Sequence, residues 1–313
     1  MKNENEIKNN NNKGKMTRKE FLKTSTVALL GIGVLGAGYK KSSGKNVSKL
    51  VKLGKTGIDV SLIGFGASRT MEPSLVDAAI ETGFTFLDTG RSYTNGRNEV
   101  MIGEVLGSRR KDVVIQSKVK VNLRQQEDGF FAADDVKKTL DEMTASMNAS
   151  LKALRTDYID IMLIHGVADL QIAFFEPIMK FFESAKKEGK IRAHGFSAHA
   201  NQIELLRAAN KNPFYEVIMV PYNHKGSYIH MNSGSYSEWD QPALELELDK
   251  ARKQGIGLLA MKSCSGGPYS PDGKSEPTFE NALRWIFSQN RVHSTPVAMG
   301  NFEQMEESLR ALL

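Results

Sequence analysis

The chain of 313 residues has an ordinary globular composition, with 40% hydrophobic and 25% charged residues, which argues against a disordered or fibrous protein. Its single cysteine excludes an intramolecular disulfide, a cysteine-rich zinc site and an iron–sulfur cluster held by the chain's own thiolates. No apolar run reaches the roughly 20 residues that a membrane-spanning helix needs.

The net charge of +6 is concentrated at the N-terminus, because residues 1–45 carry +7 and the remaining residues carry −1. A nearly neutral body has no general electrostatic field to attract a phosphate backbone. We therefore expect no nucleic-acid partner, and we assign the basic excess to an N-terminal leader.

Residues 1–45 have the layout of a disordered leader with an export signal. An Asn- and Lys-rich stretch over residues 1–15 predicts disorder. The string TRKEFLK (residues 17–23) and an apolar stretch over residues 27–38 follow it. The string resembles the twin-arginine consensus S-R-R-x-F-L-K, with Lys19 at the second arginine. We expect an exported protein, periplasmic or associated with the membrane only through this leader. A cytoplasmic protein with an amphipathic N-terminal helix is the alternative.

From residue 50 onward, short apolar runs alternate with amphipathic helical patterns. Residues 49–53 and 58–61 flank a Gly-Lys-Thr-Gly turn and predict a β-hairpin. Eight strand-like runs follow, at residues 62–66, 84–88, 113–118, 158–165, 191–197, 217–222, 257–261 and 294–299. Helical patterns follow the strands, for example at residues 135–154, 174–188, 202–210, 242–254 and 303–312.

Eight strand–helix units with Val- and Ile-rich strands predict a single-domain α/β fold, a (β/α)8 TIM barrel with an N-terminal β-hairpin. A doubly wound sheet is the alternative, but such a sheet usually places a full glycine fingerprint after its first strand. The first run ends in GFGAS, which lacks that fingerprint. No linker or change of composition follows residue 48, so we expect one barrel domain over residues 46–313.

Ionisable residues stand where successive strands end. Asp88 ends the second run, Lys118 the third and His165 the fourth, and Tyr93 follows Asp88 by five residues. The carboxyl ends of barrel strands meet at one mouth, where the chemistry of such barrels gathers. We therefore expect these four side chains to converge.

Three segments around these residues resemble motifs of the aldo-keto reductase family. They are the stretch from Asp88 to Tyr93 with the following NEVMIGEVL, the strand VIQSK ending at Lys118, and the strand DYIDIMLIH ending at His165. The opening KLGKTGIDVS is similar to the family's N-terminal hairpin, so the resemblance covers about residues 50–313. It implies a catalytic tetrad of Asp88, Tyr93, Lys118 and His165 and a nicotinamide cofactor, NADP(H) or NAD(H).

The chemistry of carbonyl reduction suits these residue types. Hydride addition leaves negative charge on the carbonyl oxygen, which needs a proton donor and hydrogen-bond support. We expect Tyr93 to be the general acid, with Lys118 lowering its pKa from the usual value of about 10. Asp88 would keep Lys118 charged and oriented, and His165 would hydrogen-bond the substrate oxygen.

The resemblance also implies cofactor contacts, although several positions depart from the family pattern. Met219 stands where a glutamine is common, and Gly300 stands where an arginine is common. The loss of that arginine leaves the choice between NADP(H) and NAD(H) open. The residues implied for cofactor binding are Ser197, Tyr222 as the ring on which the nicotinamide stacks, Lys262 and Ser263 as replacement phosphate contacts, and Asn301, Gln304 and Glu307.

We expect no metal site, because His194 and His199 have no acidic partner nearby in sequence. The long segment over residues 225–240 offers Tyr228, Tyr236 and Trp239 as candidate substrate contacts. The sequence therefore predicts an NAD(P)-dependent oxidoreductase that acts on a small carbonyl or alcohol substrate, such as an aldehyde, ketone or sugar. The departures at the cofactor positions leave a low-turnover nicotinamide-binding or partner-binding barrel as the alternative.

Overall fold

The computed structural model describes residues 16–29, 49–230 and 233–313. Eight parallel strands form one sheet in the order β11-β8-β7-β6-β5-β4-β3-β12. A parallel bridge between Leu259 and Ser294 links the two outer strands, so the sheet curls into a nearly closed barrel. The strands are β3 (Ile63–Gly66), β4 (Phe86–Asp88), β5 (Val114–Val119), β6 (Ile159–Ile164), β7 (Ile191–Ser197), β8 (Val217–Pro221), β11 (Gly257–Met261) and β12 (Thr295–Ala298).

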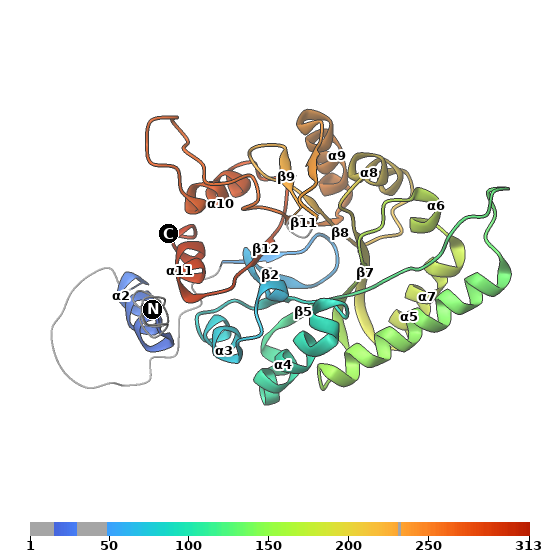
Figure 1. Cartoon of the computed structure of the whole chain (residues 1–313), viewed down its shortest axis with the longest axis horizontal. Helices are drawn as coiled ribbons and strands as arrows, with labels where there is room; N and C mark the ends of the chain where they lie inside the picture. The colour runs from blue at the N-terminus through green and yellow to red at the C-terminus, as the bar shows by residue number, and fades with distance from the viewer. Residues whose placement is uncertain (1–15, 30–48, 231–232) are drawn as a thin grey trace, which may run out of the picture.

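Helices surround this barrel, as Figure 1 shows. They are α3 (Pro73–Glu81), α4 (Arg97–Leu106), α5 (Ala133–Ala153), α6 (Leu170–Ala173), α7 (Glu176–Lys187), α8 (Gln202–Lys211), α9 (Gln241–Gln254), α10 (Phe279–Ser288) and α11 (Phe302–Arg310). The predicted (β/α)8 barrel is confirmed. All eight predicted strands are present, within two residues of the expected bounds at each end.

Side chains alternate between the two faces of each strand and build two cores. In β8, Val217 and Met219 point into the barrel, where they pack with Phe86, Leu259 and Met261. Ile218 and Val220 point outward, into the layer between the strands and the helices. This alternation decides which side chains near the strand ends can reach the mouth of the barrel.

The predicted N-terminal hairpin is also present. Strands β1 (Leu50–Lys52) and β2 (Asp59–Ser61) pair antiparallel. Their connection contributes Leu53 and Ile58 to the inner core, where both are almost fully buried. The hairpin therefore packs against the barrel interior. A second hairpin, β9 (Ser227–Ile229) with β10 (Tyr236–Glu238), lies inside the segment expected to be a long loop.

The structure differs from the expected disordered leader over α2 (Arg18–Leu29), which is a helix that packs on the barrel. Phe21 is fully buried, and its ring lies 5.4 Å from that of Phe302 at the start of α11. Arg18 forms ion pairs with Asp77 at 2.5 Å and with Glu81 at 3.0 Å, both on α3. Burial of an aromatic ring and pairing with two carboxylates offset the entropy of ordering this segment.

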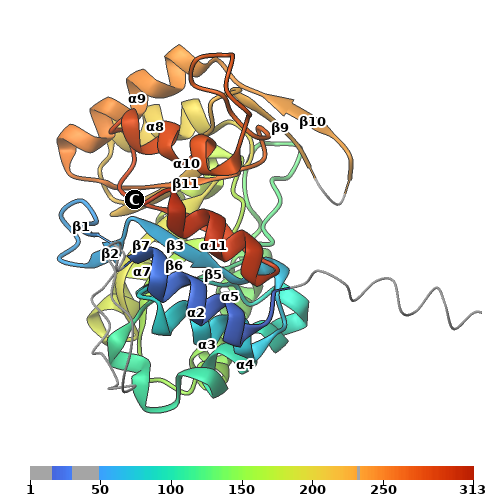
Figure 2. The ribbon, with the colours of Figure 1, turned by 90° about the vertical axis from the view of Figure 1, so that its left-hand side faces the viewer.

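Figure 2 shows α2 alongside α11 and above α3. The rest of the predicted leader, residues 1–15 and 30–45, lies outside the described residues. No helix among residues 16–29, 49–230 and 233–313 is long and apolar enough to cross a membrane.

The docking of α2 predicts that its one buried ring contributes to stability. Phe21→Ala should lower the free energy of unfolding by about 2–4 kcal/mol, because it removes a buried aromatic side chain. Denaturant unfolding of the full chain measures this loss. Lys19→Ala on the exposed side of the same helix is the matched control. Equal stabilities of the two variants would show that α2 is not held by Phe21.

Candidate active site

A cavity of about 580 Å³ opens among the carboxyl ends of the barrel strands. The four side chains expected to converge, Asp88, Tyr93, Lys118 and His165, all line it. They come from the ends of β4, β5 and β6 and from the loop after β4. The structure thus brings these four residues to one site.

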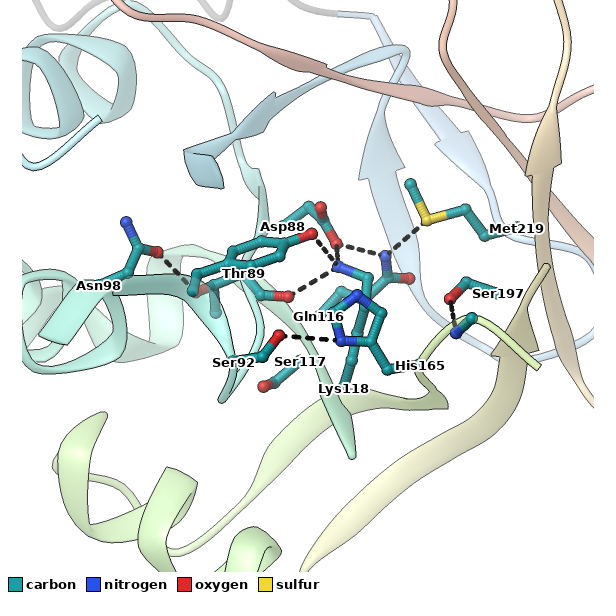
Figure 3. Close-up of polar contacts among 12 residues, drawn as sticks. Asp88, Thr89, Ser92, Asn98, Gln116, Ser117, Lys118, His165, Ser197 and Met219 are labelled. Atoms are coloured by element: carbon teal, nitrogen blue, oxygen red, sulfur yellow. Dashed lines mark hydrogen bonds and ion pairs between the residues drawn. The ribbon is translucent and has the colours of Figure 1, made fainter. Parts of the chain in front are cut away.

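Lys118 lies at the centre of this site, with its side chain only 3% exposed. Its Nζ donates to Asp88 Oδ1 at 2.5 Å, to the carbonyl oxygen of Thr89 at 2.7 Å and to the hydroxyl of Tyr93 at 3.2 Å. An ammonium has three donors, so every N–H of Lys118 has a partner. Figure 3 shows these contacts converging on one nitrogen. This arrangement fixes the ammonium beside the Tyr93 hydroxyl.

Asp88 has a second buried donor. Gln116 Nε2 donates to the same Asp88 Oδ1 at 2.6 Å and lies 3.4 Å from the sulfur of Met219. Gln116 is fully buried. Two donors on one carboxylate oxygen hold Asp88 in one orientation. Gln116 therefore positions the carboxylate from inside the barrel.

Burial and neighbouring charges act in opposite directions on the pKa values of Lys118 and Tyr93. Burial disfavours the ammonium, but Asp88 and Tyr93 together outweigh it and raise the pKa of Lys118. Burial raises the pKa of Tyr93 above its usual value, and the opposing charge of Lys118 does not reverse this shift. Lys118 lowers that pKa as expected, but desolvation and the Asp88 charge exceed its influence, so the net shift is upward. Tyr93 is accordingly a protonated donor at neutral pH.

His165 is neutral in this surrounding. Burial, followed by the nearby charge of Lys118, lowers its pKa to about 3. Its Nδ1 lies 3.1 Å from the hydroxyl of Ser92, on the loop that carries Tyr93. When that hydroxyl donates, the ring proton resides on Nε2, which can then donate to another group. The Tyr93 and His165 rings lie 5.8 Å apart, edge to face.

Two buried polar anchors hold the loop that carries Tyr93. Thr89 Oγ1 donates to Asn98 Oδ1 at 2.7 Å, and the Asn98 amide donates to two backbone carbonyl groups after β3. Farther along, Arg91 pairs with Glu99 at 2.7 Å, and Glu99 accepts from the hydroxyl of Ser117 at 2.6 Å. These anchors start from α4, so this helix positions the tyrosine.

The same loop contains backbone strain. Thr94 and Asn95 both have positive φ, 50° and 54°, a region that costs L-residues free energy. Gly96 is also left-handed, and a Cβ there would lie 1.2 Å from Nη2 of Arg91. The positive φ favours glycine at this position, and any Cβ there would displace the Arg91 guanidinium. The anchors described above stabilise the strained turn.

Comparison with known proteins identifies the relatives of this barrel. The Aldo/keto reductase family model matches residues 67–281. The chain belongs to the aldo/keto reductase family. Members of this family generally bind nicotinamide cofactors, and the chain is an aldo-keto reductase-like oxidoreductase.

Individual relatives agree with this assignment. The chain is 34% identical over 152 residues to the uncharacterized oxidoreductase YqkF of Bacillus subtilis, and the match spans 47% of this chain and about half (48%) of that protein. It is 26% identical over 305 residues to the L-galactose dehydrogenase of Arabidopsis thaliana, covering 84% of this chain and 88% of that protein. The holo form of aldo-keto reductase AKR11C1 from Bacillus halodurans shares the fold, with a TM-score of 0.66 and 21% identity over 85% of this chain and 91% of that chain.

Five of the seven residues predicted to contact the cofactor line the cavity of this reductase-like barrel, namely Ser197, Lys262, Ser263, Gln304 and Glu307. Ser197 accepts from the backbone N–H of Gly166 at 3.0 Å and donates to the carbonyl of Ile164 at 3.2 Å. Its hydroxyl therefore also ties the ends of β6 and β7 together.

The structure does not place Tyr222 or Asn301 on the cavity. Tyr222 is fully buried in the outer layer, where its hydroxyl bonds Glu245 at 2.9 Å and its ring packs 5.3 Å from Trp285. It lies three residues after Met219, so the alternation along the strand directs it away from the barrel interior. Its expected stacking role is thus contradicted. Asn301 caps α11 by accepting from the backbone N–H of Gln304.

Other cavity residues were missed by the sequence analysis. Arg69 and Ser68 follow β3, His199 follows β7, and Met261 ends β11. Their positions after strand ends were the available signal, but no motif distinguished them from exposed loop residues. Of the expected substrate contacts, Tyr236 is 60% exposed and Tyr228 is 3% exposed. Ile229, next to Tyr228, lines the cavity instead.

His194 and His199 were considered as a possible metal-binding pair, and the structure places them in different environments. His194 stacks between Phe182 and Phe214 in the outer layer, whereas His199 lines the cavity. No group of three potential metal-binding side chains is found in the part of the chain that the structure describes.

The anchor at Glu99 gives a stability prediction. Glu99→Ala should lower the free energy of unfolding by about 3 kcal/mol, because the Arg91 guanidinium and the Ser117 hydroxyl lose their buried partner. Glu104→Ala is the matched control, since its pair with Arg155 is well exposed and should contribute about 0.5 kcal/mol or less. Chemical denaturation measures both values. A loss no larger than the control's would contradict the anchoring role.

Proposed function

We propose that this chain transfers a hydride between a nicotinamide dinucleotide and the carbonyl or alcohol group of a small molecule. We propose Tyr93 as the proton donor for reduction and, as a phenolate, the proton acceptor for oxidation. The observation that carries the proposal is the placement of Lys118 Nζ, bonded at once to Asp88, to the Thr89 carbonyl and to the Tyr93 hydroxyl.

The proposed mechanism assigns one task to each side chain. Negative charge develops on the substrate oxygen as its carbon is reduced, and a protonated Tyr93 is suited to neutralise it. The buried ammonium of Lys118 would stabilise the phenolate that Tyr93 becomes after donating its proton. Asp88 keeps that ammonium charged and in place. Neutral His165 would donate a hydrogen bond to the same oxygen and so orient the carbonyl.

The residues present fit a dinucleotide. The cavity extends from the four residues at the ends of β4–β6 to α11, where Arg69, Ser263 and Ser308 line it together with Gln304 and Glu307. A cation and hydroxyl donors suit the phosphate groups. When bound, the nicotinamide would supply the hydride. We propose NADP(H) as the cofactor, because Arg69 stands close to the position of Gly300, with NAD(H) as the alternative.

We also propose that the leader directs the protein to the membrane or beyond it. The support is the TRKEFLK string and the apolar stretch after it. Arg18 and Phe21 of that string contact the barrel, so a receptor that reads them would have to displace α2. Export would favour a tightly held cofactor, since free dinucleotide is expected to be scarce outside the cytoplasm. Fractionation of cells that express the full chain tests this proposal, and a purely cytoplasmic chain would contradict it.

Removal of one oxygen atom tests the proposed chemistry. Tyr93→Phe should lower kcat for NADPH-dependent carbonyl reduction by about 10³-fold or more, because the proton donor is lost. It should leave cofactor binding, followed by NADPH fluorescence, within about twofold. Tyr236→Phe, at an exposed tyrosine, is the matched control. Unchanged turnover of Tyr93→Phe would reject the mechanism, and a stable wild-type chain without turnover across carbonyls and alcohols would favour the binding-protein alternative.

A further inference from the structure

Lys262 is a basic residue of the cavity to which the proposed mechanism assigns no role. It follows β11, lines the cavity and is half-buried. Its backbone is left-handed, with φ of 58°, which is unfavourable for a residue with a long side chain. A strained backbone at a cavity is a reason to ask what the side chain does there.

The surrounding structure fixes this strained position. The carbonyl oxygen of Lys262 accepts from Asn223 Nδ2 at 3.1 Å and from the backbone N–H of Ser265 at 3.0 Å. Asn223 is fully buried after β8 and also donates to the carbonyl of Ser227 on β9. One asparagine therefore ties the turn after β11 to the β9–β10 hairpin. These bonds fix the backbone from which the Lys262 side chain extends.

The ammonium of Lys262 lies over an aromatic face. Its Nζ is 5.0 Å from the ring centroid of Tyr228, which is almost fully buried. No carboxylate within ion-pair distance and no hydrogen-bond acceptor of Nζ occurs among residues 16–29, 49–230 and 233–313. Burial, and then the charge of Arg69, lower the pKa of Lys262. The ring stabilises the cation, but all three N–H donors remain available to a ligand.

His199 is a second polar residue of the cavity close to Lys262. It lines the cavity from the loop after β7, and the hydroxyl of Tyr228 bonds its backbone carbonyl at 3.4 Å. Burial, and then the charge of Lys262, lower the pKa of His199 to about 4, so the ring is neutral. Its buried Nδ1 has no partner among the described residues. Together, the Lys262 ammonium offers a ligand one positive charge, and the neutral His199 ring offers it an additional hydrogen bond.

We infer that Lys262, assisted by His199, binds a carboxylate of the substrate, so that the substrate is a small carbonyl compound with a single negative charge. This inference rests on the proposed function. It differs from the expectation that Lys262 contacts a phosphate of the cofactor. In the sheet, β8 and β12 flank β11 on opposite sides. The ammonium lies over Tyr228 on β9, whereas Arg69 follows β3 and Gln304 and Glu307 belong to α11.

Charge also favours this assignment. Asp88 is engaged by Lys118 and Gln116, and Glu307 accepts from the backbone N–H of Phe279 at 3.2 Å. Each of these two carboxylates thus has a partner elsewhere, and neither forms an ion pair with Lys262. A ligand carboxylate would restore neutrality at a half-buried cation, where screening by water is reduced.

The test uses a pair of substrates that differ in charge. Reduction of 4-carboxybenzaldehyde and of its methyl ester is measured with the full wild-type chain and with Lys262→Gln. The wild type should favour the carboxylate, and Lys262→Gln should lower kcat/KM for it about tenfold or more, with a small change for the ester. Lys262→Arg should retain part of the preference. Lys225→Gln, an exposed lysine in the same loop region, is the matched control and should behave as wild type.

Two binding measurements separate the possible failures. NADPH affinity, read by fluorescence, should be unchanged within about twofold in Lys262→Gln; a tenfold loss of NADPH affinity with an unchanged substrate preference would overturn the inference and return Lys262 to the cofactor. Calorimetric titration with benzoate should show binding that Lys262→Gln abolishes. If benzoate binds in this way while no carbonyl is turned over, the proposed function fails and the anion site stands. If the wild type reduces both aldehydes equally, the proposed function stands and the inference is wrong.

Discussion

The buried ammonium of Lys118 is the constraint on which this site depends. A charge that is 3% exposed is tolerated only when its partners replace the lost water. Here the partners are a carboxylate, a backbone carbonyl and a phenol, and together they use every N–H. Because Asp88 and Tyr93 bond the same nitrogen, the requirement to satisfy the ammonium also fixes the distance between the proton donor and the charge that would stabilise its phenolate.

The barrel supplies rigidity, and the loop after β4 supplies the phenol. β4, β5 and β6 are consecutive in the sheet, so the backbone of the barrel sets the positions of Asp88, Lys118 and His165. Tyr93 instead stands in a loop with left-handed residues, which would not hold its shape unaided. The Arg91–Glu99 pair and Asn98 stabilise this loop from α4. Residues outside the site thus determine the position of the proposed donor.

Much of this arrangement follows from the sequence. Strands with apolar runs that end in one polar residue predict both the barrel and the place where those residues meet, because parallel strands share one carboxyl edge. The role predicted for Tyr222 was wrong, because it was taken from a family pattern without regard to the alternation of side chains along a strand. A residue three positions after Met219 points to the opposite face of the sheet. A period-two count from Met219 directs that ring outward and could have corrected it.

Other features depend on contacts between distant segments. Arg69 lines the cavity after β3, which pairs with β12, and no motif distinguishes it from an exposed loop residue. The helix α2 has an export-like string whose Phe21 packs against Phe302 near the other end of the chain. The direction of the pKa shift of Tyr93 depends on how far desolvation exceeds the influence of Lys118. Motif spacing predicts which residues lie beside Tyr93, but the net effect of burial on its pKa can be found only from the folded structure.

The pH dependence of kcat/KM for carbonyl reduction tests the central claim most directly, because it reports which group gives up the proton. Burial raises the pKa of Tyr93 and lowers that of His165 to about 3. Reduction requires protonated Tyr93 and neutral His165, so kcat/KM should be constant from about pH 6 to 9 and should fall only above about pH 10. A proton-linked step between pH 6 and 7 that disappears in His165→Gln would contradict the account, because the imidazole would then be the titrating acid.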